Sequence, residues 1–231
     1  MVKGSSTEFG TKVDQKFWPF PRLDKIVGTN ITLEPLRSTH LADLWTSVSA
    51  HPDSFDYLRY GPFNSKIELG TLLDNLSSRA DQPFWAVVPK GGVATGWLSI
   101  CDVYQNDGSI EIGSIWFSPT LQGTRYGREA IFLLMCQCMD ELGYERLVWR
   151  CQAQNKKSFR AAESLGFRHE GTWRNAAVVD GWQRDVAWFS ILKDEWPVRR
   201  KAFSKWLSPD NFDDTGKQLK GLRELRAEIE L

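Results

Sequence analysis

The most chemically suggestive stretch of this chain is residues 121–130, LQGTRYGREA. It follows a segment of alternating apolar residues and precedes apolar residues at helical spacing, so its glycines fall in the first turn of a helix. Free backbone N–H groups there, together with the helix dipole, form a site for an anion such as a pyrophosphate. Arg125 and Arg128 could add charge-assisted phosphate contacts. On this stretch alone, a plain turn in which Gly123 and Gly127 allow close packing is an equal interpretation.

Two other phosphate-binding turns are not favoured by this spacing. The residues match neither G-x-x-x-x-G-K-[ST], the P-loop, nor G-x-G-x-x-G, the turn that binds dinucleotides.

A second stretch, residues 155–167 (NKKSFRAAESLGF), follows the next predicted strand. Asn155 is a good helix N-cap, with Ser158 at the third position of the helix. Gly166 suits a left-handed C-cap. Helix capping explains Asn155 and Gly166 without any function, but it does not explain why this unit comes one strand after the anion-binding turn.

Taken in order, these stretches resemble the GNAT acetyltransferase superfamily, and most closely its branch of ribosomal-protein N-terminal acetyltransferases and their small-molecule relatives. Residues 112–118 (IGSIWFS) are similar to the strand before the family's acyl-CoA loop. Residues 122–127 (QGTRYG) resemble its Q-x-x-G-x-G/A loop, and residues 155–167 resemble its N-x-x-S…G-F motif. The letters FWAV, GWL, RD and FS resemble its central and closing strands, at residues 84–87, 96–98, 184–185 and 189–190.

The resemblance covers about residues 29–197 and implies the fold. We expect an α/β (α+β) domain with a central mixed, mostly antiparallel twisted sheet flanked by helices. It also implies acetyl-CoA as the co-substrate, with no metal. The residues that it assigns to the cofactor are Phe117, Ser118, Gln122, Gly123, Thr124, Arg125, Tyr126, Gly127, Arg128, Asn155 and Ser158. The loop departs from the family at its fourth position, where the usual glycine is Arg125.

Direct transfer is the implied reaction: an amine attacks the thioester in a ternary complex, with no acyl-enzyme. Glu111 is the expected general base, and a solvent-facing strand carboxylate is the alternative interpretation of this residue. Ser158 is the expected acid or hydrogen-bond donor to the leaving thiolate, while Asn155 holds the pantetheine or thioester region. A backbone N–H near residues 117–118 could polarise the thioester carbonyl. The rival acids are Tyr104, Tyr126 and Tyr144.

The elements that must position these residues follow from apolar periodicity. Three units are predicted: an N-terminal arm (residues 1–28), the acyltransferase domain (29–197) and a charged helical C-terminal extension (198–231). Within the arm, residues 1–16 are polar and loose, and residues 17–21 (FWPFP) form a strap. Strands are expected at residues 31–36, 83–88, 94–103, 109–117, 146–152, 167–171, 172–179 and 184–192. Helices are expected around residues 39–48, 66–80, 123–142 and 155–165.

Composition narrows the class of protein. The 231 residues carry 29 basic and 29 acidic side chains, so the zero net charge does not favour binding to nucleic acid or to an anionic membrane. The four cysteines form no C-x-x-C pair, which favours a reducing compartment, and the N-terminus lacks a signal peptide. We therefore expect a cytoplasmic enzyme. The C-terminal helix packs on the domain or forms a homodimer.

The acceptor is not fixed by the sequence. Eleven tryptophans, among them Trp85, Trp97, Trp116, Trp173, Trp182 and Trp188, favour a closed aromatic pocket for a small-molecule amine. A peptide N-terminus, which needs an open polar groove, is the first alternative. The second is a protein that binds acyl-CoA without catalysis, with Arg125 as a mark of decay.

Overall fold

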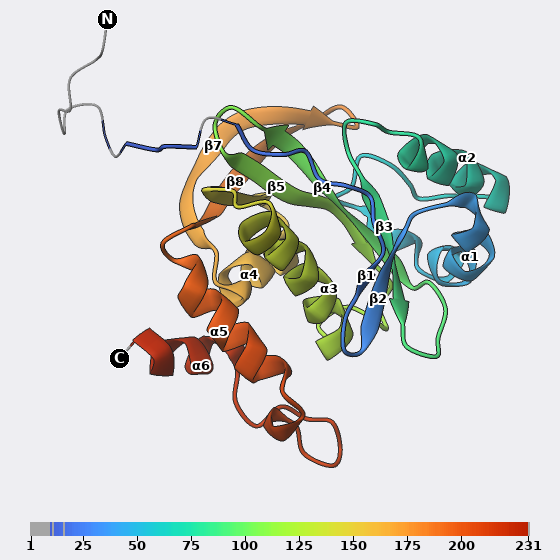
Figure 1. Cartoon of the computed structure of the whole chain (residues 1–231). Helices are drawn as coiled ribbons and strands as arrows, with labels where there is room; N and C mark the ends of the chain where they lie inside the picture. Colours follow the sequence, from blue (N-terminus) through green and yellow to red (C-terminus); the bar gives the residue numbers. More distant parts are fainter. Residues whose placement is uncertain (1–9, 11, 16, 231) are drawn as a thin grey trace, which may run out of the picture.

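The computed structural model describes residues 10, 12–15 and 17–230, so most of the predicted loose arm, residues 1–16, lies outside the described residues. Eight strands form one sheet in the order β1-β2-β3-β4-β5-β6-β8-β7 (Figure 1). The strands are β1 (Ile26–Val27), β2 (Ile31–Pro35), β3 (Phe84–Pro89), β4 (Gly96–Tyr104), β5 (Ser109–Phe117), β6 (Arg146–Gln152), β7 (Arg168–Val179) and β8 (Trp182–Leu192). The helices are α1 (Leu41–Ala50), α2 (Lys66–Ser77), α3 (Arg125–Cys136), α4 (Lys156–Leu165), α5 (Trp196–Leu207) and α6 (Leu222–Glu230).

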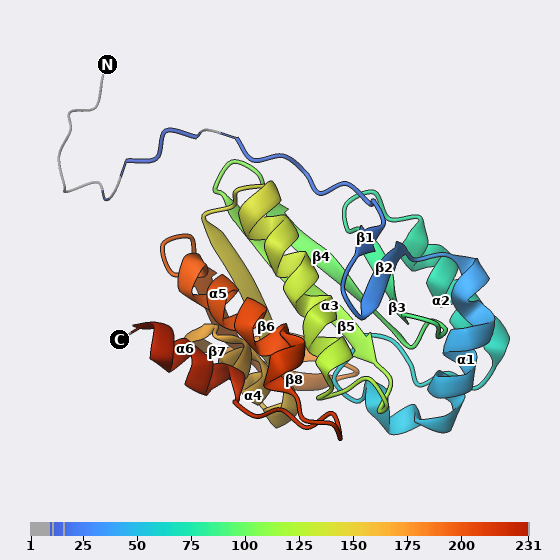
Figure 2. The same ribbon diagram turned by 60° about the horizontal axis from the view of Figure 1, so that its bottom comes forward.

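Helices cover both faces of the sheet because its strands bury side chains on both sides. In β3, Trp85 and Val87 join a large core that also contains apolar residues of α3, α4, α5 and α6. Phe84 and Ala86 point the other way, into a second core beneath α1 and α2. Figure 2 shows α3 and α5 side by side on the first face. The α+β architecture predicted from the sequence is confirmed, with one parallel strand pair in an otherwise antiparallel sheet.

That parallel pair, β5 and β6, stays together for only three residues. Its register joins Ser109 to Arg146, Ile110 to Leu147 and Glu111 to Val148. Both strands continue, β5 to Phe117 and β6 to Gln152, but they no longer pair with each other, while β6 stays paired with β8 along its other edge from Arg146 to Gln152. The sheet therefore opens into a V beyond Glu111.

Two expectations about the C-terminal half need correction. The two strands expected at residues 167–171 and 172–179 are one long strand, β7 (Arg168–Val179), and a turn at Asp180 and Gly181, with positive φ at both positions, joins it to β8. The C-terminal extension is two helices rather than one, separated by residues 208–221, because Pro209 and Gly216 interrupt the helical pattern. Leu219, in the segment between the two helices, is exposed, whereas Leu222 and Leu225 of α6 are buried.

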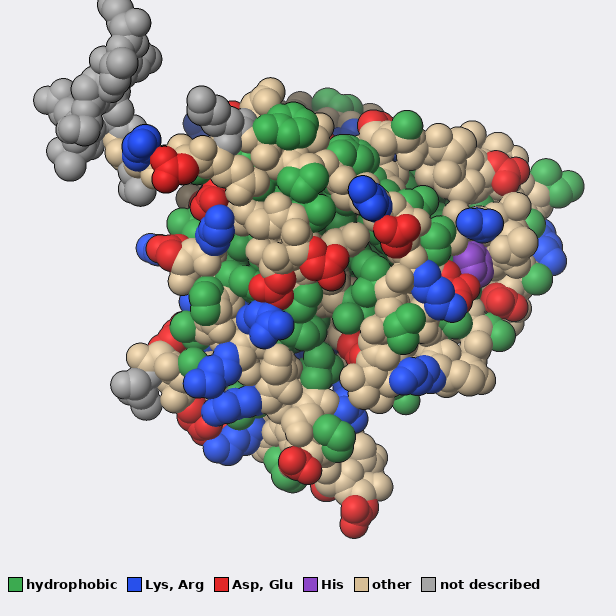
Figure 3. All heavy atoms as spheres, viewed as in Figure 1, with side chains coloured by type: hydrophobic (Ala, Val, Ile, Leu, Met, Phe, Trp, Pro, Cys, Tyr) green, Lys and Arg blue, Asp and Glu red, His purple; other side chains and the backbone are tan. Residues whose placement is uncertain are grey.

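The segment at residues 17–21 does act as a strap. Trp18 is buried, its backbone N–H donates to the Gln105 carbonyl at 2.9 Å, and its indole donates to the Gly143 carbonyl at 2.8 Å. Acidic and basic side chains are interspersed over the face drawn in Figure 3, with Lys and Arg gathered near α5 and α6.

Candidate active site

The V in the sheet is held open by a β-bulge. Trp97 pairs with Trp116 and Ser99 pairs with Gly113, so β5 carries one extra residue over this span. Ser114 absorbs it with a φ of 49°. The Gln82 side chain donates to the Ser114 hydroxyl at 3.0 Å and fixes the bulge. Backbone groups of β5 that face β6 beyond this point have no ladder partner on that strand, which leaves a gap where an extended ligand can bond to backbone.

The glycine-containing loop ends at the wide end of this V and presents free backbone donors. Thr124 caps α3, and its hydroxyl accepts from the Gly127 N–H at 3.3 Å. The backbone N–H groups of Gly123, Arg125 and Tyr126 have no acceptor among the described residues. Because these donors lie at a helix N-terminus, they form a site for an anionic group such as a pyrophosphate.

Gly127 is required by a close approach. A Cβ at this position would lie 2.6 Å from the Leu121 carbonyl oxygen, a distance that forces the loop to shift. Gly123 is there for its φ of 70°, since the space around it is open.

The side chains of the loop's arginines are turned to the C-terminal segment. The Arg125 guanidinium donates to the Leu207 carbonyl and lies 4.3 Å from the centroid of the Phe212 ring. Arg128 lies 4.9 Å from the Trp206 ring, and burial lowers the pKa of its guanidinium. Of these two residues only Arg125 has a free backbone N–H, because the Arg128 N–H donates to the Thr124 carbonyl at 3.2 Å.

The start of α4 lies on the other arm of the V. Asn155 caps the helix, and its side-chain oxygen accepts from the Ser158 N–H at 3.0 Å. The Ser158 hydroxyl accepts from the indole N–H of Trp149 at 3.1 Å. Because the indole supplies that proton, the Ser158 hydroxyl keeps its own proton to donate.

Glu111 lies at the vertex of the V and is buried, so the solvent-facing alternative is wrong. The Arg150 Nε donates to its carboxylate at 2.5 Å. Burial raises the pKa of the Glu111 carboxyl to about 7, although the Arg150 charge opposes this shift. A carboxyl with this pKa exchanges a proton near neutral pH, as a general base must.

Two further residues complete this network. Arg150 also pairs with Asp102, which a second bulge, this time in β4, turns toward it with a φ of 45°. The Arg150 guanidinium lies 4.7 Å from the Trp188 ring. No sequence signal marks Arg150 or Asp102, because their meeting depends on sheet register and on a bulge.

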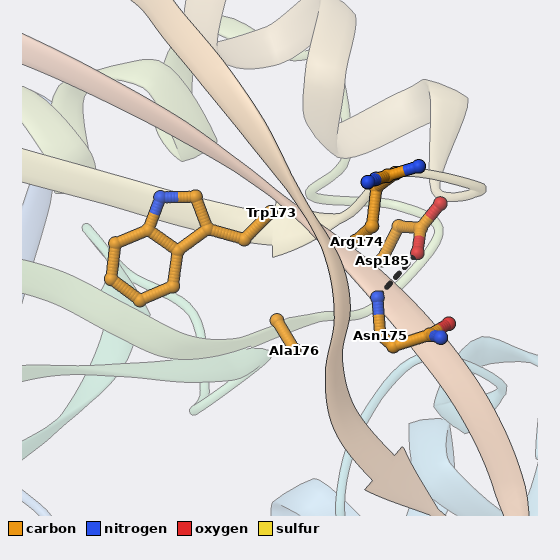
Figure 4. A pocket seen from close by; sticks show the side chains of 5 residues that line it. All are labelled: Trp173, Arg174, Asn175, Ala176 and Asp185. Carbon is orange, nitrogen blue, oxygen red and sulfur yellow. Dashed lines mark hydrogen bonds between the residues drawn. The ribbon is translucent and has the colours of Figure 1, made fainter.

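A hollow on the β7–β8 hairpin continues from this network. Trp173 packs against Trp188 with the ring planes tilted by 37° and 4.4 Å between the ring centroids. Beside Trp173 lies an open hollow of about 740 Å³, and the Asn175 backbone N–H donates to Asp185 across it (Figure 4). It is lined by Trp173, Arg174, Asn175, Ala176 and Asp185.

Three of the six tryptophans named for a small aromatic pocket are elsewhere. Trp85, Trp97 and Trp116 are fully buried in the two cores. Trp97 and Trp116 stack on each other at 4.6 Å. They stabilise the sheet that carries the site and cannot line a ligand pocket.

The remaining expected groups are either bonded elsewhere or exposed. The Ser118 N–H donates to the Thr95 carbonyl at 3.0 Å, so this N–H is not free for a ligand. Tyr144 donates to the Pro19 carbonyl at 3.1 Å. Tyr104 and Tyr126 are largely exposed.

Comparison with known proteins gives a consistent result. The profile described as an acetyltransferase (GNAT) domain matches residues 30–168. A GCN5-related N-acetyltransferase structure from Brucella melitensis superposes with a TM-score of 0.90 at 38% identity, covering 93% of this chain and 99% of the other. A protein of Bacillus subtilis (strain 168) named "Putative ribosomal N-acetyltransferase YdaF" is 27% identical over 71% of this chain and 90% of its own length.

A more distant structure shares the fold. The microcin C7 self immunity acetyltransferase MccE, solved in complex with acetyl-CoA and AMP, has a TM-score of 0.63 at 21% identity, covering 71% of this chain and 93% of that one. Within residues 10, 12–15 and 17–230, no group of three His, Cys, Asp or Glu side chains is placed to hold a metal. No helix in that part of the chain is long and apolar enough to cross a membrane.

Proposed function

This chain belongs to the GNAT acetyltransferase family, and we propose that it transfers an acetyl group from acetyl-CoA to the α-amino group of a polypeptide. The single observation that carries the proposal is the V between β5 and β6, which has a loop of free N–H groups at one end and Glu111 at its vertex. We assign the catalytic unit to residues 29–197, with residues 1–28 and 198–231 as attached segments.

The residues present fit the cofactor. Gly123, Arg125 and Tyr126 offer backbone N–H groups to a pyrophosphate, and the absent side chain at Gly127 lets the loop close to that geometry. Gln122 supports the loop, since its side chain donates to the Phe117 carbonyl at 2.8 Å. When bound, acetyl-CoA supplies an activated acyl group as a thioester.

The proposed chemistry uses groups on both arms of the V. Glu111, ionised, takes a proton from the amine, directly or through one water. Unpaired N–H groups of β5 stabilise the negative charge that develops on the carbonyl oxygen. Ser158 donates its hydroxyl proton toward the departing sulfur, while Asn155 and Trp149 hold it in place.

A polypeptide acceptor is favoured by the shape of the accessible surface. The hollow next to the Glu111 network is open and partly polar, with Asp185 and Arg174 in its lining. Two proteins of similar fold or sequence are named for ribosomal acetylation, the Bacillus subtilis relative and a Vibrio cholerae structure called a ribosomal-protein-serine acetyltransferase. A small-molecule amine is the second candidate, supported by the exposed ring of Trp173.

The test is an acceptor screen with acetyl-CoA and thiol release as the readout. A panel of peptides with free N-termini is compared with the same peptides blocked at the N-terminus and with small primary amines. We expect release only with free N-termini, and the product's acetyl group on the α-nitrogen by mass spectrometry. Release with small amines alone would overturn the polypeptide assignment.

A further inference from the structure

The C-terminal loop segment, residues 206–220, closes on the first turn of the cofactor helix. Leu207 ends α5 beside the N-terminus of α3 (Figure 2), and its carbonyl accepts from the Arg125 guanidinium. The same guanidinium lies over the Phe212 ring, and Arg128 lies over Trp206. Both arginines of the proposed phosphate loop are thus held by a segment that lies outside the region matched by the family profile, residues 30–168.

This segment has a fixed internal structure. Asn211 is buried, and its side chain donates to the carbonyls of Trp206 and Lys220, each at 3.1 Å, and accepts from the Lys220 N–H at 3.0 Å. The Trp206 indole donates to the Gln218 side chain at 2.8 Å. The Trp206 and Phe212 rings meet edge to face at 5.4 Å. The aromatic surface offered to the arginines is therefore preorganised rather than a loose tail.

Arg125 connects this surface to the phosphate loop. Its backbone N–H is one of the three free donors, while its side chain is fixed by Leu207 and Phe212. Fixing the side chain restricts the backbone of the loop's fourth residue, so less order has to be imposed when an anion binds.

We propose that residues 206–220 are a functional part of the coenzyme A site, which clamp Arg125 and thereby raise affinity for the cofactor. The proposal rests on the proposed function, since it concerns the same loop. Arg125 is then a positioning residue: it acts on the cofactor through its own backbone, and the clamp replaces the glycine that the family usually has at this position. This role differs from the alternative in which Arg125 marks a loop that has lost its function because the side chain obstructs it.

The experiment measures the Kd of coenzyme A by calorimetry for the wild type, Phe212→Leu, Arg125→Met and the double variant. Each single substitution should raise the Kd about 2- to 30-fold, the range expected for loss of one cation–π contact. The double variant should lose little more than Arg125→Met alone, because that substitution already removes the contact with Phe212 together with the hydrogen bond to Leu207. Hydrogen exchange should speed up at the amides of residues 123–126 in both single variants.

The matched control is Phe203→Leu, because Phe203 also joins α5 to α3, stacking on Phe132 at 4.7 Å, but far from the loop. It should lower thermal stability and leave the Kd unchanged. Unchanged affinity in both Phe212→Leu and Arg125→Met, or tighter binding by Arg125→Met, would overturn the clamp alone. A wild-type chain that binds no coenzyme A would overturn the proposed function and the clamp with it.

Discussion

Replacing Arg150 by an uncharged residue should shift the acidic limb of the pH–rate profile to higher pH. Arg150→Met keeps an unbranched side chain but removes the guanidinium, which lies over the Trp188 ring and whose Nε donates to the Glu111 carboxylate at 2.5 Å. With that charge gone, burial and the negative charge of Asp102 both raise the pKa of Glu111 further above 7. Because the base must be ionised to accept a proton, the acidic limb of the pH–rate profile follows this pKa.

The size of the effect can be worked from the contact. Two charges about 4 Å apart at an effective dielectric constant of 20 interact by about 4 kcal/mol, roughly three pKa units. The Arg150 side chain is 29% exposed and is shared with Asp102, so we expect solvent screening to leave about one to two units. At pH 7 the ionised fraction, and kcat/KM with it, should fall roughly 5- to 50-fold and recover as the pH rises to about 9.

The assay is kcat/KM against pH on a confirmed acceptor, for the wild type, Arg150→Met, Arg150→Lys and Asp102→Asn. Arg150→Lys retains the charge and should keep its limb near that of the wild type. Asp102→Asn removes a negative charge and lowers the pKa of Glu111, so the acidic limb of the profile should shift to lower pH. An Arg150→Met profile that drops uniformly without shifting would refute the assignment of Glu111 as the titrating base.

Three further predictions concern the cofactor loop and the leaving group. Gly127→Ala should weaken coenzyme A binding by roughly 5- to 150-fold, the 1–3 kcal/mol typical of overpacking, because its Cβ meets the Leu121 carbonyl. Gly123→Ala has open space and should weaken binding less, by about 5- to 30-fold, through its positive φ alone. Calorimetry that ranks Gly123→Ala as the worse binder would contradict this geometry. Ser158→Ala should lower kcat about 10- to 100-fold at constant KM for acetyl-CoA. Trp149→Phe, which removes the indole N–H that donates to the Ser158 hydroxyl, should lower kcat less. If steady-state kinetics show an unchanged kcat in Ser158→Ala, the hydroxyl has no part in the mechanism. Coenzyme A at one hundred times its Kd should stabilise the chain by about 2.7 kcal/mol, a rise in melting temperature of about 5–10 °C by differential scanning fluorimetry, whereas no rise would mean that the native state does not bind it.

Local patterns predicted most of the strands and helices. Residues 109–117 and 146–152 alternate or run apolar between turn residues, and both became strands with the predicted bounds. Asn155 and Gly166 mark the ends of α4 because their side-chain and backbone preferences act within one turn. These features depend on neighbours in the sequence, so the sequence reveals them.

The sequence could not predict the contacts between residues that are far apart along the chain. Arg125 reads as a phosphate ligand in its own loop, yet its guanidinium contacts Phe212, 87 positions later. The bulge at Asp102 depends on strand register, and that bulge is what brings Asp102 to Arg150. The sequence does not distinguish Trp97 and Trp116, which are buried in the core, from Trp173, which is exposed.

The most direct test of the account is whether coenzyme A is released before the acceptor arrives. Acetyl-CoA is mixed rapidly with an equal concentration of protein, with and without an accepted peptide, and free thiol is followed over one turnover. Direct attack by an amine activated by Glu111 predicts thiol release only when the peptide is present, at a rate that depends on peptide concentration. A burst of thiol equal to the protein concentration without peptide would show an acyl-enzyme and contradict transfer in a ternary complex.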